Sequence, residues 1–256
     1  MSDILAKLPP DQVAGFYGRL ADQVDMNKGA LQTSLAADLM RQWLKNRVRN
    51  SLYTFTAPSH LTNHSDVRSV LKYHRAVYLT EEKARFTGGS SKWAGLLPRI
   101  QGKAPHPKWN MMGPMNLEYQ SLVELPLRYQ LTGSDADRDI LYALHGFQLK
   151  TMATVTVMPI QNSKKVKVTF TSFKASVIDT YDWDYSEHLS VPNPDFGSKL
   201  PDAIAPDQKT VRVYHSNAKR VEDAGLAAPY RLECTPWQVM DPAVTGPGEI
   251  DPSKSI

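Results

Sequence analysis

Residues 147–170 read FQLKTMATVTVMPIQNSKKVKVTF, and this stretch decides the fold. Apolar side chains recur at alternate positions on both sides of a polar turn at residues 161–165. Alternation of this kind is the period of a strand with one buried face. The stretch therefore predicts an antiparallel β-hairpin at the centre of the second half of the chain.

The alternation shifts by one residue just after this hairpin. Up to Phe170 the apolar positions of the second strand have even numbers, whereas from Phe173 they have odd numbers. One extra residue in a strand is a β-bulge, and bulges often redirect side chains beside functional sites. If the strand continues, we expect Asp179 and Tyr181 to share the side of Phe173 and Asp182 to point the other way.

The first half of the chain has mainly helical patterns. A helix is predicted to start at Pro9-Pro10-Asp11, and a second one covers about 33–49. Residues 51–56 alternate like a strand, and residues 67–80 fit either a strand or a short helix.

The segment between these halves contains a connection and two short elements. Residues 98–116 are rich in proline and methionine and predict a long connection, and residues 122–131 predict a strand. Ser134 is expected to cap a short helix over about 135–145, because its hydroxyl can accept from an amide of the first turn.

The remaining patterns complete an α+β fold. Further strands are expected at residues 211–215, 231–234 and 237–240. We expect a mostly helical N-terminal region and an antiparallel β-sheet that dominates the second half of the chain. The predicted domains are 1–120, 121–240 and a flexible tail over 241–256.

Composition and charge exclude an internal disulfide and do not indicate a particular binding partner. The 256 residues carry a formal net charge of +4, which is too mild to point to one anionic partner. No basic patch with interleaved aromatic residues indicates nucleic acid. Cys234 is the one cysteine, so no internal disulfide can form, and we expect it to be a buried, inert thiol. The first residues lack the apolar run of a signal peptide, so we expect synthesis in a bacterial cytoplasm.

Residues 172–188 concentrate the groups that can carry chemistry. Asp179, Tyr181, Asp182 and His188 fall within about ten residues. Magnesium needs only one or two protein carboxylates, and another carboxylate can act as a base towards water. A phenol or an imidazole can protonate a leaving oxygen. The alternative is a polar loop in which the aspartates bond backbone amides.

The spacing Asp179-x-Tyr181-Asp182-x5-His188 resembles the signature of colicin M and related lipid II-degrading bacteriocins. That family carries Asp-x-Tyr-Asp, then five residues, then His-Arg, at the exit of a strand, in a catalytic domain built as a half-open, barrel-like antiparallel sheet with flanking helices. The resemblance implies this architecture for residues 121–240, with residues 1–120 for delivery or support. The resemblance covers roughly residues 147–190, and four of the five motif positions match.

The resemblance implies an antibacterial toxin that hydrolyses the undecaprenyl–pyrophosphate linkage of lipid II and so blocks peptidoglycan synthesis. It implies Mg²⁺ as cofactor, held by Asp179 and Asp182, with Asp179, Tyr181, Asp182 and His188 as catalytic residues. It also implies an immunity protein and action in the periplasm of a target cell. Residues 1–120 match no uptake part of the family, so we expect export or injection by a secretion apparatus of the producing cell.

The chain departs from the family at the residue after the histidine. The family has arginine there, and this chain has Leu189. Three explanations stay open. A cation from elsewhere binds the phosphate, with Lys199, Arg212 and Arg220 as candidates; the chain hydrolyses another substrate; or the site is inactive.

Two other functions remain as alternatives to the toxin. A non-catalytic interaction protein, secreted or derived from a phage, would use the Asp-Tyr loop to bind a partner, and Leu189 favours it. Another magnesium-dependent phosphodiesterase, including a nuclease, would use the same carboxylates. His60 and His64 have the spacing of two metal ligands on a helix, but Pro58 and Asn63 favour a loop there.

Overall fold

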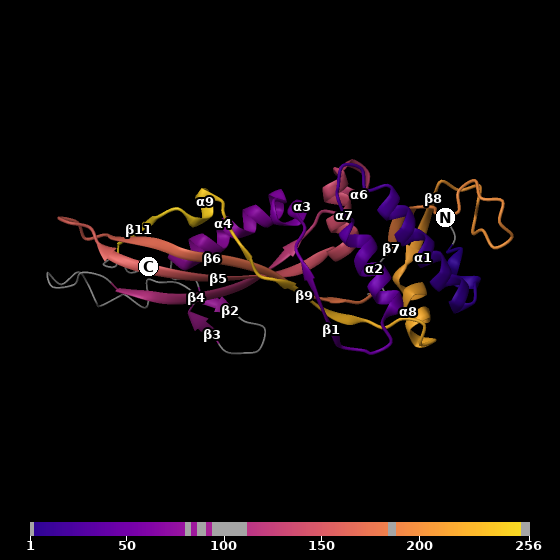
Figure 1. Cartoon of the computed structure of the whole chain (residues 1–256), viewed down its shortest axis with the longest axis horizontal. Helices are drawn as coiled ribbons and strands as arrows, with labels where there is room; N and C mark the ends of the chain where they lie inside the picture. The colour runs from indigo at the N-terminus through magenta and orange to yellow at the C-terminus, as the bar shows by residue number, and fades with distance from the viewer. Residues whose placement is uncertain (1–2, 80–82, 86–90, 94–111, 184–187, 252–256) are drawn as a thin grey trace. The chain divides into compact units, whose positions relative to one another are not determined.

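The structure is a computed structural model that describes residues 3–79, 83–85, 91–93, 112–183 and 188–251 (Figure 1). The predicted α+β class is confirmed. The described chain contains a large open sheet, and helices occur before, between and after its strands in the sequence. None of the helices in these ranges is long and apolar enough to cross a membrane.

Seven strands make up the large sheet, in the order β1-β9-β6-β5-β4, with β10 and β11 also paired to β6. Their bounds are β1 (Ser51–Thr56), β4 (Met112–Glu124), β5 (Gly146–Pro159), β6 (Val166–Tyr181), β9 (Tyr230–Thr235), β10 (Trp237–Gln238) and β11 (Gly248–Ile250). Within the described pairings, nothing joins β1 to β4, so the sheet is not a closed barrel. The expectation of a half-open sheet is compatible with this order.

The predicted hairpin and its irregularity are both present. Strands β5 and β6 pair antiparallel, and the register shifts where Thr154 lies opposite Ser172 but Val155 lies opposite Phe170. Thr171 is thus the extra residue, as the change of parity predicted. Beyond it, odd-numbered residues of β6 are buried, starting with Phe173. The bulge therefore sets which side chains of β6 reach the candidate site.

The chain divides into two compact units, each made of three separate segments. The first comprises Met1–Leu61, Glu124–Gly146 and Asp179–Glu233, and the second comprises Thr62–Val123, Phe147–Ile178 and Cys234–Ile256. These boundaries do not coincide with those predicted at residues 120 and 240, because long strands pass from one unit into the other.

Helices surround a buried aromatic core in the first unit. They are α1 (Pro10–Met26), α2 (Leu35–Lys45), α6 (Tyr129–Thr132), α7 (Asp135–Leu144) and α8 (His215–Asp223), after a short 3₁₀ turn at Leu5–Lys7. Helix α2 packs against α1 and α7, and α1 packs against α8. Trp43 of α2 is fully buried, and its indole N–H donates to Glu222 of α8 over 3.0 Å. A hairpin of β7 (His188–Pro192) and β8 (Thr210–Tyr214) completes this unit (Figure 1).

In the second unit, helix α4 (Ser65–Leu79) packs on the β5–β6 hairpin. The ring of Tyr78 lies 5.7 Å from that of Phe173, and its hydroxyl donates to the Thr151 carbonyl over 2.9 Å. Buried His74 contacts hydroxyls of Thr151 and Ser121 at 2.8 and 2.6 Å. Residues 67–80 fitted either a strand or a short helix in the sequence. The structure shows a helix up to residue 79, because apolar residues at helical spacing pack against this sheet. Residue 80 lies outside the described ranges.

Several predicted elements match closely. Helix α1 begins at Pro10, and β1 has the predicted bounds. Ser134 caps α7 in a capping box, in which the side chains of Ser134 and Asp137 each bond the other's backbone N–H. The helix predicted over 33–49 is shorter, since α2 ends at Lys45 and Asn46 is already extended.

The strand predicted over 122–131 was wrong in its second half. Strand β4 ends at Glu124, and α6 begins at Tyr129 after a turn that includes Pro126. Leu131 fitted the apolar alternation, yet it is 84% exposed and contributes nothing to a buried strand face. Conversely, residues 112–116 belong to β4 instead of a connection, and residues 94–111 lie outside the described ranges.

Short elements account for the rest of the described chain. These are α3 (Ser59–Thr62), β2 (Lys83–Arg85), β3 (Ser91–Trp93) and α9 (Pro242–Thr245). The segment predicted as a flexible tail contains α9 and β11, and β11 pairs antiparallel with β6 from Gly248 opposite Val168. Cys234 is buried, as predicted.

Candidate functional site

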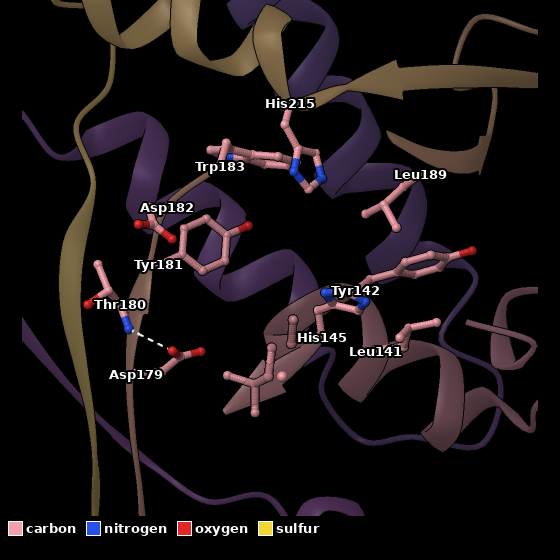
Figure 2. Close-up of a pocket in the computed structure, with 13 residues that line it drawn as sticks. Leu141, Tyr142, His145, Asp179, Thr180, Tyr181, Asp182, Trp183, Leu189 and His215 are labelled. Atoms are coloured by element: carbon pink, nitrogen blue, oxygen red, sulfur yellow. Dashed lines mark hydrogen bonds between the residues drawn. The ribbon is translucent and has the colours of Figure 1, made fainter. Parts of the chain in front are cut away.

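The end of β6 delivers three of the four motif residues to one cavity of the first unit. Asp179, Tyr181 and Asp182 line a pocket of about 240 Å³, together with residues from α7, β7 and α8 (Figure 2). Tyr181 is only 7% exposed, whereas Asp182 is an exposed residue just past the strand end. The alternation predicted from the bulge therefore holds to Tyr181, and Asp182 reaches the cavity from beyond the regular strand.

Asp179 is the residue of this cavity whose ionisation is most perturbed. Burial is the main cause that raises the pKa of Asp179 to about 7; the nearby Asp182 carboxylate contributes to the rise, and a hydrogen bond from the Thr180 N–H opposes it. That N–H donates to Oδ1 over 2.8 Å. Figure 2 shows the carboxylate turned away from its strand into the cavity. At neutral pH the carboxyl group can both take up and release a proton.

Tyr181 is held rigidly by aromatic neighbours. Its ring stacks on that of Tyr230, with centroids 5.3 Å apart and planes inclined by 10°, and it meets Trp183 edge-on at 6.2 Å. Burial raises the pKa of the Tyr181 phenol. The phenol is therefore a neutral hydroxyl, suited to donating a hydrogen bond and unsuited to acting as an anion.

Trp183 connects the cavity to the aromatic core. Its ring lies 5.3 Å from Tyr17 and 5.5 Å from Trp43, and His215 packs on it edge-to-face at 5.1 Å. These contacts fix the wall of the cavity that carries His215. Rigid support of this kind is what a precise site needs.

His145 and His215 are the two imidazoles among the described residues that line the cavity. The sequence patterns placed His145 at the end of the helix predicted over about 135–145 and His215 at the end of the strand predicted over 211–215. His145 has φ 50°, a region that non-glycine residues rarely occupy. No local pattern marks it, because it meets Asp179 only through the pairing of distant segments.

His188, the fourth motif residue, is not among the side chains that line this cavity. It is exposed on β7, opposite Tyr214 of β8, with ring centroids 5.2 Å apart. The next residue, Leu189, does line the cavity. The position at which the colicin M family has arginine therefore lies at the same cavity as Asp179 and Asp182, although this chain has an apolar side chain there.

The three cations predicted to replace that arginine lie elsewhere. Arg220 donates to the backbone carbonyls of Leu5, Ala6 and Leu8, at 3.2, 2.9 and 2.6 Å, and so fastens the N-terminal turn to α8. Arg212 lies on β8 opposite Ser190, and Lys199 is exposed between β7 and β8. In the part of the chain that the structure describes, no lysine or arginine lines the cavity.

Asp179 and Asp182 are the residues that can hold a divalent cation here. They line one cavity and repel each other, and a cation between carboxylates relieves such repulsion. Mg²⁺ keeps several waters and needs only one or two carboxylates, so this pair fits the predicted ion. Among the described residues, no group of three or more His, Cys, Asp or Glu has metal-site geometry.

Of the two histidines with metal-ligand spacing, His60 has a structural role. Its Nε2 lies 2.8 Å from Oδ2 of Asp139, a buried carboxylate. Asp139 also accepts from the Ser34 hydroxyl at 2.5 Å and the Leu35 amide at 2.9 Å, at the start of α2. His60 thus belongs to a network that ties α2 to α7, and no sequence pattern indicated Asp139 as its partner.

Comparisons with known proteins add no relative to this description. No protein-family model, no curated protein and no solved structure matches this chain.

Proposed function

We propose that this protein is an antibacterial hydrolase that cleaves the undecaprenyl–pyrophosphate linkage of lipid II. The observation that carries the proposal is the Asp179 carboxyl group. It is largely buried in a cavity beside Asp182 and Tyr181, and its pKa is raised to about 7. A carboxyl group tuned to the working pH is what general acid–base catalysis requires.

Asp179 is the base in the proposed reaction. It removes a proton from a water molecule as the water oxygen attacks phosphorus. Tyr181, held as a neutral phenol between Tyr230 and Trp183, donates a hydrogen bond to a phosphate oxygen. The stacked ring keeps that hydroxyl in place, which lowers the cost of ordering it during the reaction.

Asp179 and Asp182 would hold Mg²⁺ at the mouth of the cavity. When bound, the ion supplies positive charge that stabilises the phosphate oxygens in the transition state. This charge is needed because the described lining contains two aspartates and no lysine or arginine. Asp182, which is exposed, can reach an ion that keeps most of its water.

A donor must also protonate the oxygen that leaves. The sequence motif offers Tyr181 or His188 for this role. His188 can fill it only if its imidazole reaches the cavity, whose described lining contains His145 and His215. Lys199, Arg212 and Arg220 were predicted to bind phosphate. They would have to approach the substrate from outside the cavity, because none of them lines it.

The biological setting is part of the same proposal. A lipid II hydrolase acts at the membrane surface in the periplasm of a target cell, after secretion or injection from the cytoplasm of the producer. The producer then needs an immunity protein. The mechanism uses no nucleic acid.

The test is hydrolysis of purified lipid II by the full chain with Mg²⁺, with release of undecaprenol and the pyrophosphorylated disaccharide peptide followed by chromatography. Asp179→Asn is expected to abolish product release while the far-UV circular dichroism is unchanged. Asp207→Asn, on the exposed connection between β7 and β8, is the matched control. Intact lipid II in the wild-type reaction would refute the proposed substrate.

A non-catalytic interaction protein is the second candidate, and one observation favours it. Leu189 fills the position of the family's arginine inside the cavity, so the described lining provides no guanidinium for phosphate. In that case the Asp179→Asn variant would keep the biological activity of the wild type. Cleavage of plasmid DNA or of simple phosphodiesters with Mg²⁺, but not of lipid II, would instead indicate another phosphodiesterase.

A further inference from the structure

Two histidines far apart in sequence meet at the cavity, and the motif histidine does not line it. His145 follows α7 and His215 begins α8, and both line the cavity with Asp179. His188 is exposed beside Tyr214. The cavity that contains Asp179 is therefore lined by two imidazoles that are not part of the family signature.

His145 is held in a rare backbone conformation by its neighbours. Its φ is 50° and its ψ is −71°. Its N–H donates to the Leu141 carbonyl over 2.9 Å, and its carbonyl accepts from the Leu125 N–H over 3.0 Å. Of the four described non-glycine residues with positive φ, only His145 lines this cavity. Strained residues cluster at sites where function requires a fixed side chain.

The two helices place their histidines differently at the cavity. His145 is the C-cap of α7, and two backbone hydrogen bonds fix its main chain. His215 is the first residue of α8, and its ring is buried against Trp183. Packing thus accounts for the position of His215, and His145 is the better candidate for a direct role in the reaction.

Resting on the proposed hydrolysis, we propose that His145 is the general acid of this site and acts opposite Asp179. Water forms a bond to phosphorus and gives its proton to the Asp179 carboxylate. The bond between phosphorus and the oxygen of the undecaprenyl group breaks, and the His145 imidazolium transfers its proton to that departing oxygen. Asp179 then returns its proton to solvent and His145 takes one up. Figure 2 shows His145 and Asp179 on different walls of the same cavity.

Other ionisable groups line this cavity, and their titration also affects the pH profile of the reaction. They are Asp182, Tyr181, Tyr142 and His215. The two phenols have a raised pKa because they are buried, and they stay neutral below pH 9. Loss of an imidazole is therefore visible in the pH profile between pH 5 and 8 without interference from either tyrosine.

The first experiment compares His145→Asn, His215→Asn and His188→Asn in lipid II hydrolysis with Mg²⁺. Asparagine removes the imidazole and keeps a short polar side chain, and far-UV circular dichroism checks that each variant keeps the fold. His145→Asn is expected to lower kcat at least 100-fold with KM changed less than threefold, and to remove the fall of kcat at high pH. His188→Asn should lose less than tenfold. A 100-fold loss in His188→Asn with near wild-type kcat in His145→Asn would overturn the proposal.

A substrate with a better leaving group separates proton donation from positioning. A phosphodiester that releases p-nitrophenolate needs no general acid, so His145→Asn should recover to within about tenfold of the wild type on it. Asp179→Asn should stay inactive on the same substrate. Equal losses of His145→Asn on both substrates would show that His145 does not donate the proton.

Nuclear magnetic resonance distinguishes failure of this proposal from failure of the proposed substrate. With Mg²⁺ and inorganic pyrophosphate as probe, the imidazole signals of His145 should shift in the wild type and shift less in Asp179→Asn. If lipid II remains intact but these signals shift, the substrate is wrong and His145 still belongs to the ligand site. A shift confined to His188 would overturn the assignment of His145.

Discussion

Asp179 and Asp195 belong to the same unit, and their carboxyl groups are in opposite settings, with Asp179 half-buried and Asp195 buried. Asp195 is 3% exposed, and Arg19 donates to its two oxygens at 2.7 and 2.8 Å. The Ile204 N–H adds a third bond at 2.8 Å. Burial opposes ionisation of Asp195, but these bonds outweigh it and hold its pKa below its usual value.

Among the described residues, Asp179 has no comparable set of donors. It receives a hydrogen bond from the Thr180 N–H, and burial together with Asp182 raises its pKa to about 7. The comparison teaches that this fold can satisfy a buried carboxylate when stability requires it. At the end of β6 it leaves a carboxyl group with near-neutral pKa, which is the arrangement expected of a reactive site.

The largest expected effect comes from exchanging the two aspartates for asparagine in turn. Asp179→Asn should lower kcat for lipid II about 1000-fold or more, because an amide cannot accept the proton of water. Asp195→Asn should keep kcat within threefold for the fraction that is folded. Steady-state kinetics with active-fraction correction measures both, and equal losses would remove the distinction between the two carboxylates.

Stability should respond in the reverse order. Asp195→Ala leaves Arg19 without its partner and should lower the free energy of unfolding by about 3 kcal/mol. Asp179→Ala, which removes a poorly satisfied half-buried acid, should cost less than about 1 kcal/mol at pH 8. Urea unfolding at fixed pH compares the two variants. A larger loss in Asp179→Ala would mean that Asp179 is structural.

The pH dependence of stability should separate the same pair. The folded pKa of Asp179 is about 7, above an unfolded value of about 3.9, so its stabilising contribution is complete below pH 4 and is lost as pH rises towards 7. We expect unfolding free energy to fall by about 2 kcal/mol from pH 5 to 8, and the fall to vanish in Asp179→Asn. Asp195 has a lowered pKa, so its contribution is present above pH 4 and is lost below it.

The smallest expected effect comes from restoring the arginine of the colicin M signature. Leu189→Arg would place a guanidinium in the cavity with Asp179 and lower the pKa of that carboxyl by about one unit. Activity at pH 6 should then rise about fivefold, because the ionised fraction of Asp179 rises by that factor, and the acid limb of the pH profile should move to lower pH. Leu189→Met is the matched control, because it keeps the volume without the charge. An unchanged pH profile in Leu189→Arg would show that position 189 does not act on Asp179.

Local patterns were sufficient for much of the fold. The β5–β6 hairpin, the extra residue near Phe173 and the N-cap at Ser134 all show in local sequence patterns. Strand periodicity and capping are local properties, so sequence alone predicted them. The strand predicted at residues 122–131 failed because apolar alternation cannot distinguish buried from exposed leucines, and Leu131 is exposed.

The candidate site was likewise predictable only in part from local sequence patterns. The sequence by itself determined that Asp179, Tyr181 and Asp182 end one strand, and the bulge determined that Asp179 and Tyr181 share a side. Only the tertiary structure decided that His145, Leu189 and His215 join them and that Arg220 is used to bind the N-terminal turn. These residues come from separate elements, and the physical reason is that their meeting depends on long-range packing of α7, β7 and α8, which no local period records.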